Sequence, residues 1–389
     1  MAGQLLIRDA TVHLPAGPGR MDILCEGTRV VAIGRELAAP AARVLEAEGL
    51  NAGPGFIDVH VHGGGGYSFF GRDPGAVRSY GAWAPRNGVT SFLVSTIGRD
   101  AEETTAVFAG LAPAIGCAGG AEPLGFHLEG PFINPLRMGA FHPRMLRPPD
   151  AREFERHQRA AEGRIRQVTL APELAGAHDL IAAVRGSGAL PAMGHTDATV
   201  VEAGAGFAAG ISHVTHLFNA MRPIHQREGG PAVAAMLEDG ATCELICDGA
   251  HVAPELLRMA YRLLGPQRMV VVTDNLHIAG TEISSGSFGG QAVEVEGAKA
   301  VRADGTIVGS VATMDQHFRN AMSFLGIDPS AAFRLCAANP ARVAGAGQRK
   351  GALAPGFDAD IVLLDAAFRV CATVCRGQVV FDARAAGPA

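Results

Sequence analysis

Short apolar runs alternate with helix-like segments through the middle of the chain, from about residue 54 to residue 349. This alternation favours parallel βα units. Eight such units are what a (β/α)8 barrel of the TIM type requires, and a chain of 389 residues with 48% hydrophobic residues also has room for a small second domain. The candidate strands are residues 56–62, 90–95, 123–129, 166–171, 190–195, 213–218, 243–248 and 269–274. Candidate helices include residues 102–115, 151–162, 200–209, 254–264, 314–325 and 329–344.

The two ends of the chain show a different sequence pattern, in which short runs of alternating apolar and polar residues are broken by Gly and Pro. The runs are residues 5–12, 21–25, 29–33 and 43–45, then 360–364, 369–374 and 378–382. We therefore expect an α/β fold in which residues 1–53 and 350–389 form a small β-sandwich domain and residues 54–349 form the barrel. A Gly- and Ser-rich segment, residues 275–310, predicts a hairpin-containing flap over the barrel mouth.

Composition excludes several classes of function. The net charge is −5 and no basic cluster occurs, so nucleic acid and anionic membrane surfaces are not expected partners. We expect a soluble, cytoplasmic protein, because no signal-like segment and no 18-residue apolar stretch is found. The seven scattered cysteines contain no CxxC pair, which favours reduced thiols over disulfides or a zinc knuckle. The lysines are Lys299 and Lys350, and neither has a phosphate-binding-loop setting.

Two histidines in the first candidate strand suggest a metal site. His60 and His62 stand two residues apart, and the period of two in a strand places both imidazoles on one side. By itself, the pair also fits two core histidines bonded to the backbone. Further His, Asp or Glu residues are needed to make metal ligation a specific reading.

Those further residues stand at the C-terminal ends of other candidate strands, where the active-site residues of such barrels lie. Each has an ordinary alternative as a cap or turn residue, but their joint occurrence favours one metal site. The residues are Glu129, His195, His216 and Asp274.

A carboxylate and several imidazoles suit Zn²⁺ or Fe²⁺ with a position open for water. Glu129, His195 and His216 are expected to make one site. His60 and His62 are candidates for a second ion with Glu129 bridging, so one or two divalent ions are both compatible with the sequence. A bound ion activates water for hydrolysis, and Asp274 is placed to take its proton and pass it to a leaving amine.

Two segments near other strand ends are candidate substrate-binding segments. His251, in Asp248-Gly249-Ala250-His251, is placed to bond a sugar hydroxyl or the reacting carbonyl, or is an ordinary loop histidine. Asn219 and Ala220 offer backbone N–H groups and Arg227 offers a guanidinium, which together suit a phosphate. Arg227 is equally compatible with a solvated loop charge.

Motifs along nearly the whole chain resemble those of the N-acetylglucosamine-6-phosphate deacetylase family of the amidohydrolase superfamily. They occur in the family's order: GFIDVHVHGGGG (55–66), HLEGPF (127–132), GHTDA (194–198), THLFNAM (215–221), REGG (227–230), CDGAH (247–251), VTD (272–274) and GSVATMDQ (309–316). The resemblance implies metal-dependent hydrolysis of the N-acetyl group of N-acetylglucosamine 6-phosphate to acetate and glucosamine 6-phosphate.

The same resemblance implies roles for individual residues. It makes Glu129, His195 and His216 metal ligands, Asp274 the acid/base and His251 a substrate contact. The phosphate site would comprise Asn219, Ala220 and Arg227. It also implies a homodimer in which the arginine reaches into the neighbouring subunit's site.

Two positions depart from the family pattern. Phe141 stands where the family often has a histidine that polarises the acetyl carbonyl, and a one-residue slip would give that role to His142. Asn275-Leu276-His277-Ile278 replaces a run of small residues after Asp274, which leaves the size or identity of the substrate open.

Two other functions therefore stay open. One is hydrolysis of another N-acyl amino sugar or of an N-acyl amino acid. The other is a catalytically silent barrel that binds a sugar phosphate.

Overall fold

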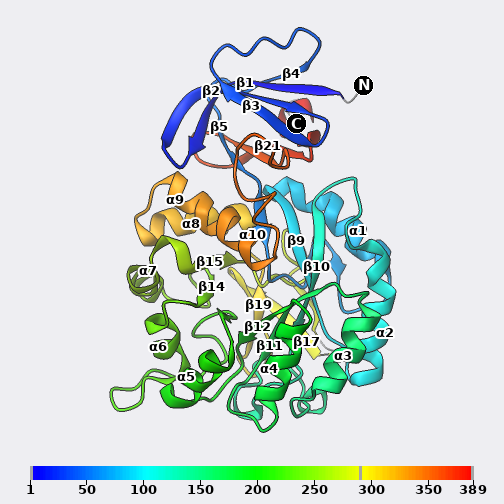
Figure 1. The fold of residues 1–389 in the computed structure, drawn as a ribbon, viewed down its shortest axis with the longest axis vertical. Helices are drawn as coiled ribbons and strands as arrows, with labels where there is room; N and C mark the ends of the chain where they lie inside the picture. The colour runs from blue at the N-terminus through cyan, green and yellow to red at the C-terminus, as the bar shows by residue number, and fades with distance from the viewer. Residues whose placement is uncertain (1–2, 289–290, 387–389) are drawn as a thin grey trace.

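Two eight-stranded sheets organise the molecule, one a parallel barrel and the other built from both ends of the chain (Figure 1). The computed structural model describes residues 3–288 and 291–386. Strands from both ends of the chain make up the upper sheet of Figure 1, and the barrel with its ring of helices lies below it. The expected fold class, a barrel with a small β domain from both termini, is confirmed.

The barrel strands pair in parallel in the order β15-β14-β13-β12-β11-β10-β9-β6. The circle closes beyond the ends of β6 and β15, where the Asp274 N–H donates to the His60 carbonyl at 2.9 Å and the His62 N–H donates to the Asn275 carbonyl at 2.8 Å. The strands are β6 (Phe56–Asp58), β9 (Val89–Thr96), β10 (Glu122–Glu129), β11 (Ile165–Leu170), β12 (Leu190–Met193), β13 (His213–Val214), β14 (Thr242–Ile246) and β15 (Met269–Val272).

A helix follows each barrel strand and covers the outside of the barrel (Figure 1). These helices are α1 (Pro74–Trp83), α2 (Ala101–Leu111), α3 (Ala151–Ala160), α4 (Ala177–Gly186), α5 (Val200–Ala209), α6 (Gly230–Leu237), α7 (Pro254–Arg268) and α8 (Met314–Leu325). After α8 come α9 (Pro329–Phe333), a π-helical turn (Arg334–Ala338) and α10 (Asn339–Val343). Among the described helices, none has the length and apolarity that crossing a bilayer requires.

Several barrel strands end earlier than the sequence predicts, just before the residues expected to act. His195, His216 and Asp274 have φ angles of 49°, 28° and 52°. An L-residue with positive φ leaves the β region, so the regular ladder stops ahead of it. The positive φ changes the direction of these three side chains relative to a regular strand. Such strained backbone is typical of functional sites.

The terminal sheet has the order β22-β21-β20-β5-β1-β2-β3, with β4 pairing β1. Its strands are β1 (Gln4–Leu14), β2 (Gly17–Glu26), β3 (Arg29–Gly34), β4 (Arg43–Glu46), β5 (Asn51–Pro54), β20 (Ile361–Leu364), β21 (Val370–Cys375) and β22 (Gln378–Asp382). The expected sandwich is thus one continuous sheet around a shared apolar cluster. The strand β5, absent from the predicted runs, joins the two ends of the chain by pairing with both β1 and β20.

Close packing at Gly53 and Gly55 explains the glycines of the turn that leads into the barrel. A Cβ atom at Gly53 would lie 2.1 Å from the Phe333 ring, and one at Gly55 would lie 2.2 Å from the Thr90 side chain. The predicted domain boundaries at residues 53 and 350 stay a prediction, and residues 1–2 and 387–389 lie outside the described residues.

The segment predicted as a flap carries a four-stranded antiparallel sheet, β16 (Ser285–Phe288), β17 (Gln291–Glu296), β18 (Lys299–Val301) and β19 (Ile307–Ser310). The predicted hairpin corresponds to β17 and β18, which pair in antiparallel fashion. Leu276 and Ile278 are each 1% exposed and pack into the apolar cluster of this sheet. The unusual residues after Asp274 therefore help to build the flap. Residues 289–290 of the segment lie outside the described residues.

Candidate active site

Six side chains from five barrel strand ends meet at the mouth of the barrel. They form two groups of possible metal ligands, in each of which the ligand atoms lie within 4.8 Å of one another: Glu129, His195 and His216, and His60, His62 and Asp274. All six are 8% exposed or less. The structure therefore brings together every residue that the sequence suggested as a ligand or as the acid/base.

The first group centres on one oxygen of Glu129. Its Oε1 lies 3.1 Å from Nε2 of His195 and 3.0 Å from Nε2 of His216. The two Nε2 atoms are themselves 3.0 Å apart. The three ligand atoms therefore form a compact triangle.

The second group lies against the same carboxylate. Nε2 of His60 and Nε2 of His62 are each 3.4 Å from Oδ1 of Asp274. Glu129 reaches both rings, with Oε1 3.4 Å from His60 and Oε2 3.2 Å from His62. Glu129 thus stands between the two groups, as the sequence predicted for a bridging carboxylate.

The hydrogen bonds on the far side of the rings show that this donor set suits cations. Nδ1 of His62 faces the Ser95 carbonyl at 3.1 Å, and Nδ1 of His195 faces the Arg137 carbonyl at 2.9 Å. A carbonyl only accepts, so Nδ1 carries the hydrogen, and in the neutral ring Nε2 presents a lone pair. These lone pairs point at carboxylate oxygens, and such contacts between acceptors are favourable only when a proton or a metal cation lies between them. Buried Nε2 of His60 has no hydrogen-bond partner among the described residues, which also fits a ligand atom.

The pKa values show how strongly the carboxylates and the imidazoles act on one another. Burial lowers the pKa of His62, but the facing carboxylates of Asp274 and Glu129 outweigh it and raise that pKa to about 9. Burial raises the pKa of Glu129, yet the positive charge of His60 outweighs this effect and holds the pKa well below its ordinary range. Protons and metal cations therefore compete for the same ring nitrogens.

Five of these six side chains, all except His60, line the floor of a cavity of about 280 Å³. Asn219, Ala220 and His251 line its wall, as expected for substrate-binding residues. His251 is oriented by Asp248, whose Oδ2 lies 2.6 Å from its Nδ1. The described residues that line the cavity include no lysine or arginine, so its carboxylates have no fixed cation on this chain.

Comparison with known proteins agrees with this arrangement. The model of the amidohydrolase family matches residues 52–380. The chain belongs to the amidohydrolase family. The resemblance predicted from the motifs is thereby confirmed, together with the class of enzyme, a hydrolase.

Individual amidohydrolases resemble this chain over most or nearly all of its length. N-acetylglucosamine-6-phosphate deacetylase of Bacillus subtilis (strain 168) is 33% identical over 99% of each chain. N-acetylgalactosamine-6-phosphate deacetylase of Escherichia coli O157:H7 is 31% identical over 84% of this chain and 86% of its own. A mutant N-acetyl-D-glucosamine-6-phosphate deacetylase of Mycobacterium smegmatis, solved in complex with N-acetyl-D-glucosamine-6-phosphate, superposes with a TM-score of 0.91. It is 36% identical, over 97% of this chain and 99% of that chain.

Two of the predicted site residues lie outside the cavity of this amidohydrolase. Phe141 lines the cavity, with its ring centroid 5.2 Å from that of His195, whereas His142 does not line it. Nδ1 of His142 accepts the Arg144 N–H and caps a short helix, Pro143–Met145. A one-residue shift would have placed His142 in the cavity, in the position of the family's carbonyl-polarising histidine. The structure does not show this shift.

Arg227 is the second such residue. It is exposed on the loop before α6 and does not line this chain's cavity. Among the described residues, no hydrogen bond or ion pair holds its guanidinium.

The sequence analysis missed parts of the cavity and of its support. Phe288, Thr306, Ile307 and Val308 of the flap line one wall, and no sequence pattern marks them. Glu244, by contrast, carries a visible signal, because it is a charge in the middle of the apolar strand β14. Its Oε2 lies 2.9 Å from Nδ1 of His60.

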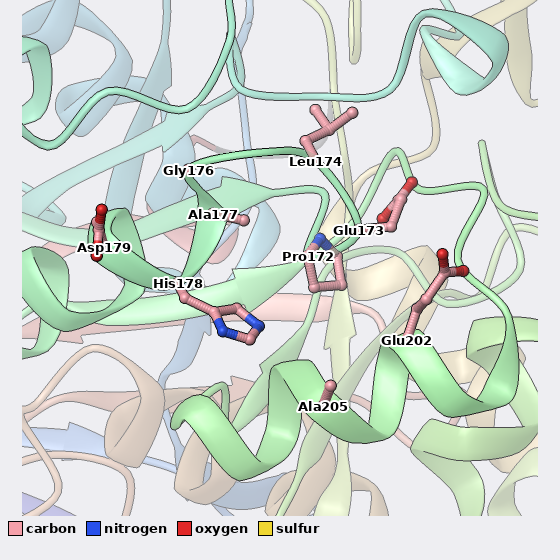
Figure 2. A pocket seen from close by; sticks show the side chains of 9 residues that line it. All are labelled: Pro172, Glu173, Leu174, Gly176, Ala177, His178, Asp179, Glu202 and Ala205. Carbon is pink, nitrogen blue, oxygen red and sulfur yellow. The ribbon is translucent and has the colours of Figure 1, made fainter.

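A second hollow, of about 400 Å³, opens at the surface between α4 and α5 (Figure 2). It contains none of the predicted site residues, and His178, Asp179 and Glu202 on its rim are exposed. Glu173 at its edge accepts from Oγ1 of Thr196 at 2.6 Å and from the Asp197 N–H at 2.7 Å. This hollow therefore adjoins the turn that follows His195 without reaching the metal-ligand groups.

Proposed function

We propose that this amidohydrolase removes the N-acetyl group of N-acetylglucosamine 6-phosphate, producing acetate and glucosamine 6-phosphate. The observation that carries the proposal is the contact of one carboxylate, Glu129, with four imidazoles at the floor of the cavity, beside Asp274. The substrate is supported by relatives with this activity in their names, which match 99% of the chain in one case.

We assign the metal ligands residue by residue. Glu129, His195 and His216 would hold one divalent cation, and His60, His62 and Asp274 would hold a second beside Glu129. Imidazole and carboxylate ligands suit Zn²⁺ or Fe²⁺. A cation bound here would lower the pKa of water toward about 7 and polarise the acyl carbonyl.

Asp274 is the proton carrier in this proposal. Burial raises the pKa of Asp274, but the charge of His60 and the hydrogen bond from His62 outweigh it and keep it lowered, so the carboxylate is ionised and able to accept. It takes a proton from water as the water oxygen bonds to the acyl carbon. It then delivers that proton to the amine nitrogen as the C–N bond breaks.

The sugar phosphate is assigned to the cavity wall. His251, oriented by Asp248, bonds the sugar or its carbonyl, and Asn219 and Ala220 contact the phosphate. Arg227 is exposed, which supports the expected homodimer, in which it would reach the cavity of the partner subunit. The expected cytoplasmic location stays part of this proposal.

Release of acetate from N-acetylglucosamine 6-phosphate tests the proposal. Purified protein, supplied in turn with Zn²⁺, Fe²⁺ and Mn²⁺, is expected to release one acetate per sugar, and Asp274→Asn serves as the inactive control. No release with any of the three metals would refute the proposal. Binding of the sugar phosphate without turnover would instead support the silent, sugar-binding barrel.

A second experiment separates phosphate recognition from general deacylation. The wild type and Arg227→Ala are compared on phosphorylated and unphosphorylated N-acetylglucosamine, with the exposed Arg152→Ala as a matched control. A rise in KM for the phosphorylated sugar alone is expected for Arg227→Ala. An unchanged KM, or faster hydrolysis of an N-acyl amino acid, would favour the alternative deacylase.

N-acetylgalactosamine 6-phosphate, the 4-epimer of N-acetylglucosamine 6-phosphate, is a second candidate substrate. A relative named N-acetylgalactosamine-6-phosphate deacetylase matches 84% of the chain. Comparing kcat/KM for the two phosphorylated sugars decides between them.

A further inference from the structure

A buried carboxylate lies in the middle of the barrel, beneath the candidate metal centre. Glu244 belongs to β14, and its side chain is 0% exposed. No lysine or arginine among the described residues pairs with it. A buried charge is costly unless hydrogen bonds compensate it, so the groups around Glu244 indicate what it does.

Four donors surround Glu244, two on each oxygen. Oε2 accepts from Nδ1 of His60 at 2.9 Å and from the His216 backbone N–H at 3.1 Å. Oε1 accepts from the Gln167 amide at 2.7 Å and from Nε2 of His213 at 3.0 Å. A carboxylate has about four acceptor sites, so all of them are used and the group cannot turn.

The bond to His60 decides which ring nitrogen faces the metal groups. Because Glu244 only accepts, Nδ1 of His60 carries a hydrogen, and in the neutral ring Nε2 is left as a lone pair toward Asp274 and Glu129. His62 and His195 are oriented by backbone carbonyls instead. Of these three rings, only His60 depends on a side chain that substitution can alter.

We propose that Glu244 is a positioning residue that keeps Nε2 of His60 available as a ligand and so governs binding of a second divalent cation at His60, His62 and Asp274. The inference rests on the proposed metal-dependent function. Carboxylates that orient a metal-binding histidine commonly change metal affinity by about 10–100-fold when they are lost.

Two conservative variants separate the position of the carboxylate from its charge. Glu244→Asp keeps the charge but is one methylene shorter, so it cannot reach all four donors. Glu244→Gln keeps the length, and its amide oxygen can accept from both His60 and His216. Its amide nitrogen would face Gln167 and His213, and both can adapt. Oε1 of Gln167 has no partner among the described residues, and His213 has Thr242 Oγ1 2.7 Å from its Nδ1.

The measurement is zinc bound per chain at graded free Zn²⁺, together with the ring-nitrogen NMR signals that report histidine tautomers. The wild type is expected to bind two zinc ions. Glu244→Asp is expected to weaken only the second, by about 10–100-fold, and to disturb the tautomer of His60. Glu244→Gln is expected to stay close to the wild type. Glu244→Met, which removes all four acceptors, provides an independent test of the same loss.

Gln167→Met is the matched control, because it also removes a buried bond to Glu244 but touches no proposed ligand. It is expected to lower thermal stability and to keep the second zinc. Equal loss of zinc in Gln167→Met and Glu244→Asp would overturn the inference, because it would indicate a general disturbance of the barrel. A weaker second site in Glu244→Gln than in Glu244→Asp would also overturn it.

Failure of this inference is distinguishable from failure of the proposed function. A wild type that releases acetate with a single zinc ion would refute the role of Glu244 and leave the deacetylase intact. A wild type that binds two zinc ions in a Glu244-dependent way, yet hydrolyses no N-acyl sugar, would support the role of Glu244 and refute the function.

Discussion

The Nε2 atoms of His195 and His216 face each other across 3.0 Å, and both lie within 3.1 Å of the same oxygen of Glu129. Nδ1 of His195 is occupied by the Arg137 carbonyl, so its Nε2 is the atom left to bind a cation. This triangle is the strongest geometric argument for a metal centre, because its atoms repel one another unless a positive charge lies among them.

Zinc is therefore expected to stabilise the folded chain. At a free concentration 100 times its Kd, a ligand that binds only the folded state contributes about 2.7 kcal/mol, which a thermal melt detects as a rise in Tm. His195→Ala is expected to lose most of this rise. His178→Ala, an exposed histidine in the surface hollow of Figure 2, should keep all of it. Equal shifts in the two variants would contradict the assignment of His195.

Metal binding should release protons. The pKa of His62 is about 9 and that of His60 lies well above its ordinary value, because Glu129 and Asp274 outweigh the effect of burial. Both rings are therefore positively charged at pH 7, with a hydrogen on Nε2 as well as on Nδ1. A metal cation must displace the Nε2 hydrogens. Affinity should fall as pH drops below about 9, by about tenfold per pH unit for each displaced proton.

Calorimetry in two buffers of different ionisation enthalpy counts these protons. About two are expected at pH 7 if both groups fill. Zinc binding with no proton release at pH 7 would show that the rings are already neutral.

Replacing Asp274 should affect chemistry more than substrate binding. We expect Asp274→Asn to lower kcat by about 10²–10⁴-fold, because the amide cannot accept the proton, while KM changes little. Steady-state acetate release measures both constants. Asp179→Asn, an exposed carboxylate on α4, is the control and should leave both unchanged. A change in KM alone for Asp274→Asn would assign this residue to binding instead.

Lys350 should be important for stability. Its side chain is 0% exposed, and its Nζ lies 2.9 Å from Glu122 and 3.1 Å from Asp358, with Asp360 also in contact. These groups link the start of β10 to the segment that enters β20. Arg349 also pairs with Glu122 and Asp358, so Lys350→Met would leave chiefly the buried carboxylate of Asp360 without its ion-pair partner. We expect the free energy of unfolding to fall by about 3–5 kcal/mol.

Denaturant unfolding measures that loss, and the other lysine supplies the control. Lys299 lies 4.0 Å from Glu296 and is 30% exposed. Lys299→Met should therefore change the free energy of unfolding by less than about 0.5 kcal/mol. Similar losses in the two variants would mean that the buried ion cluster contributes little.

Much of the fold was predictable because it depends on local patterns. The helix predicted at residues 200–209 matches α5 to the residue, since Thr199 caps its start and Gly210, at φ 118°, ends it. The strand predicted at residues 213–218 was too long, because the apolar pattern continues past the point where His216 takes a positive φ. Hydrophobic periodicity marks where a strand is buried and carries little information on where its backbone turns.

The sequence alone determined the alternation of eight strands and helices and the identities of the residues that gather at the strand ends, because periodicity and residue order are properties of the chain itself. The tertiary structure decided that Phe141 rather than His142 lines the cavity, that Leu276 and Ile278 build the flap, and that Glu244 lies under His60. These relationships depend on which distant segments meet and at what angle. Packing and backbone conformation determine which segments meet and at what angle, and no local sequence pattern specifies this.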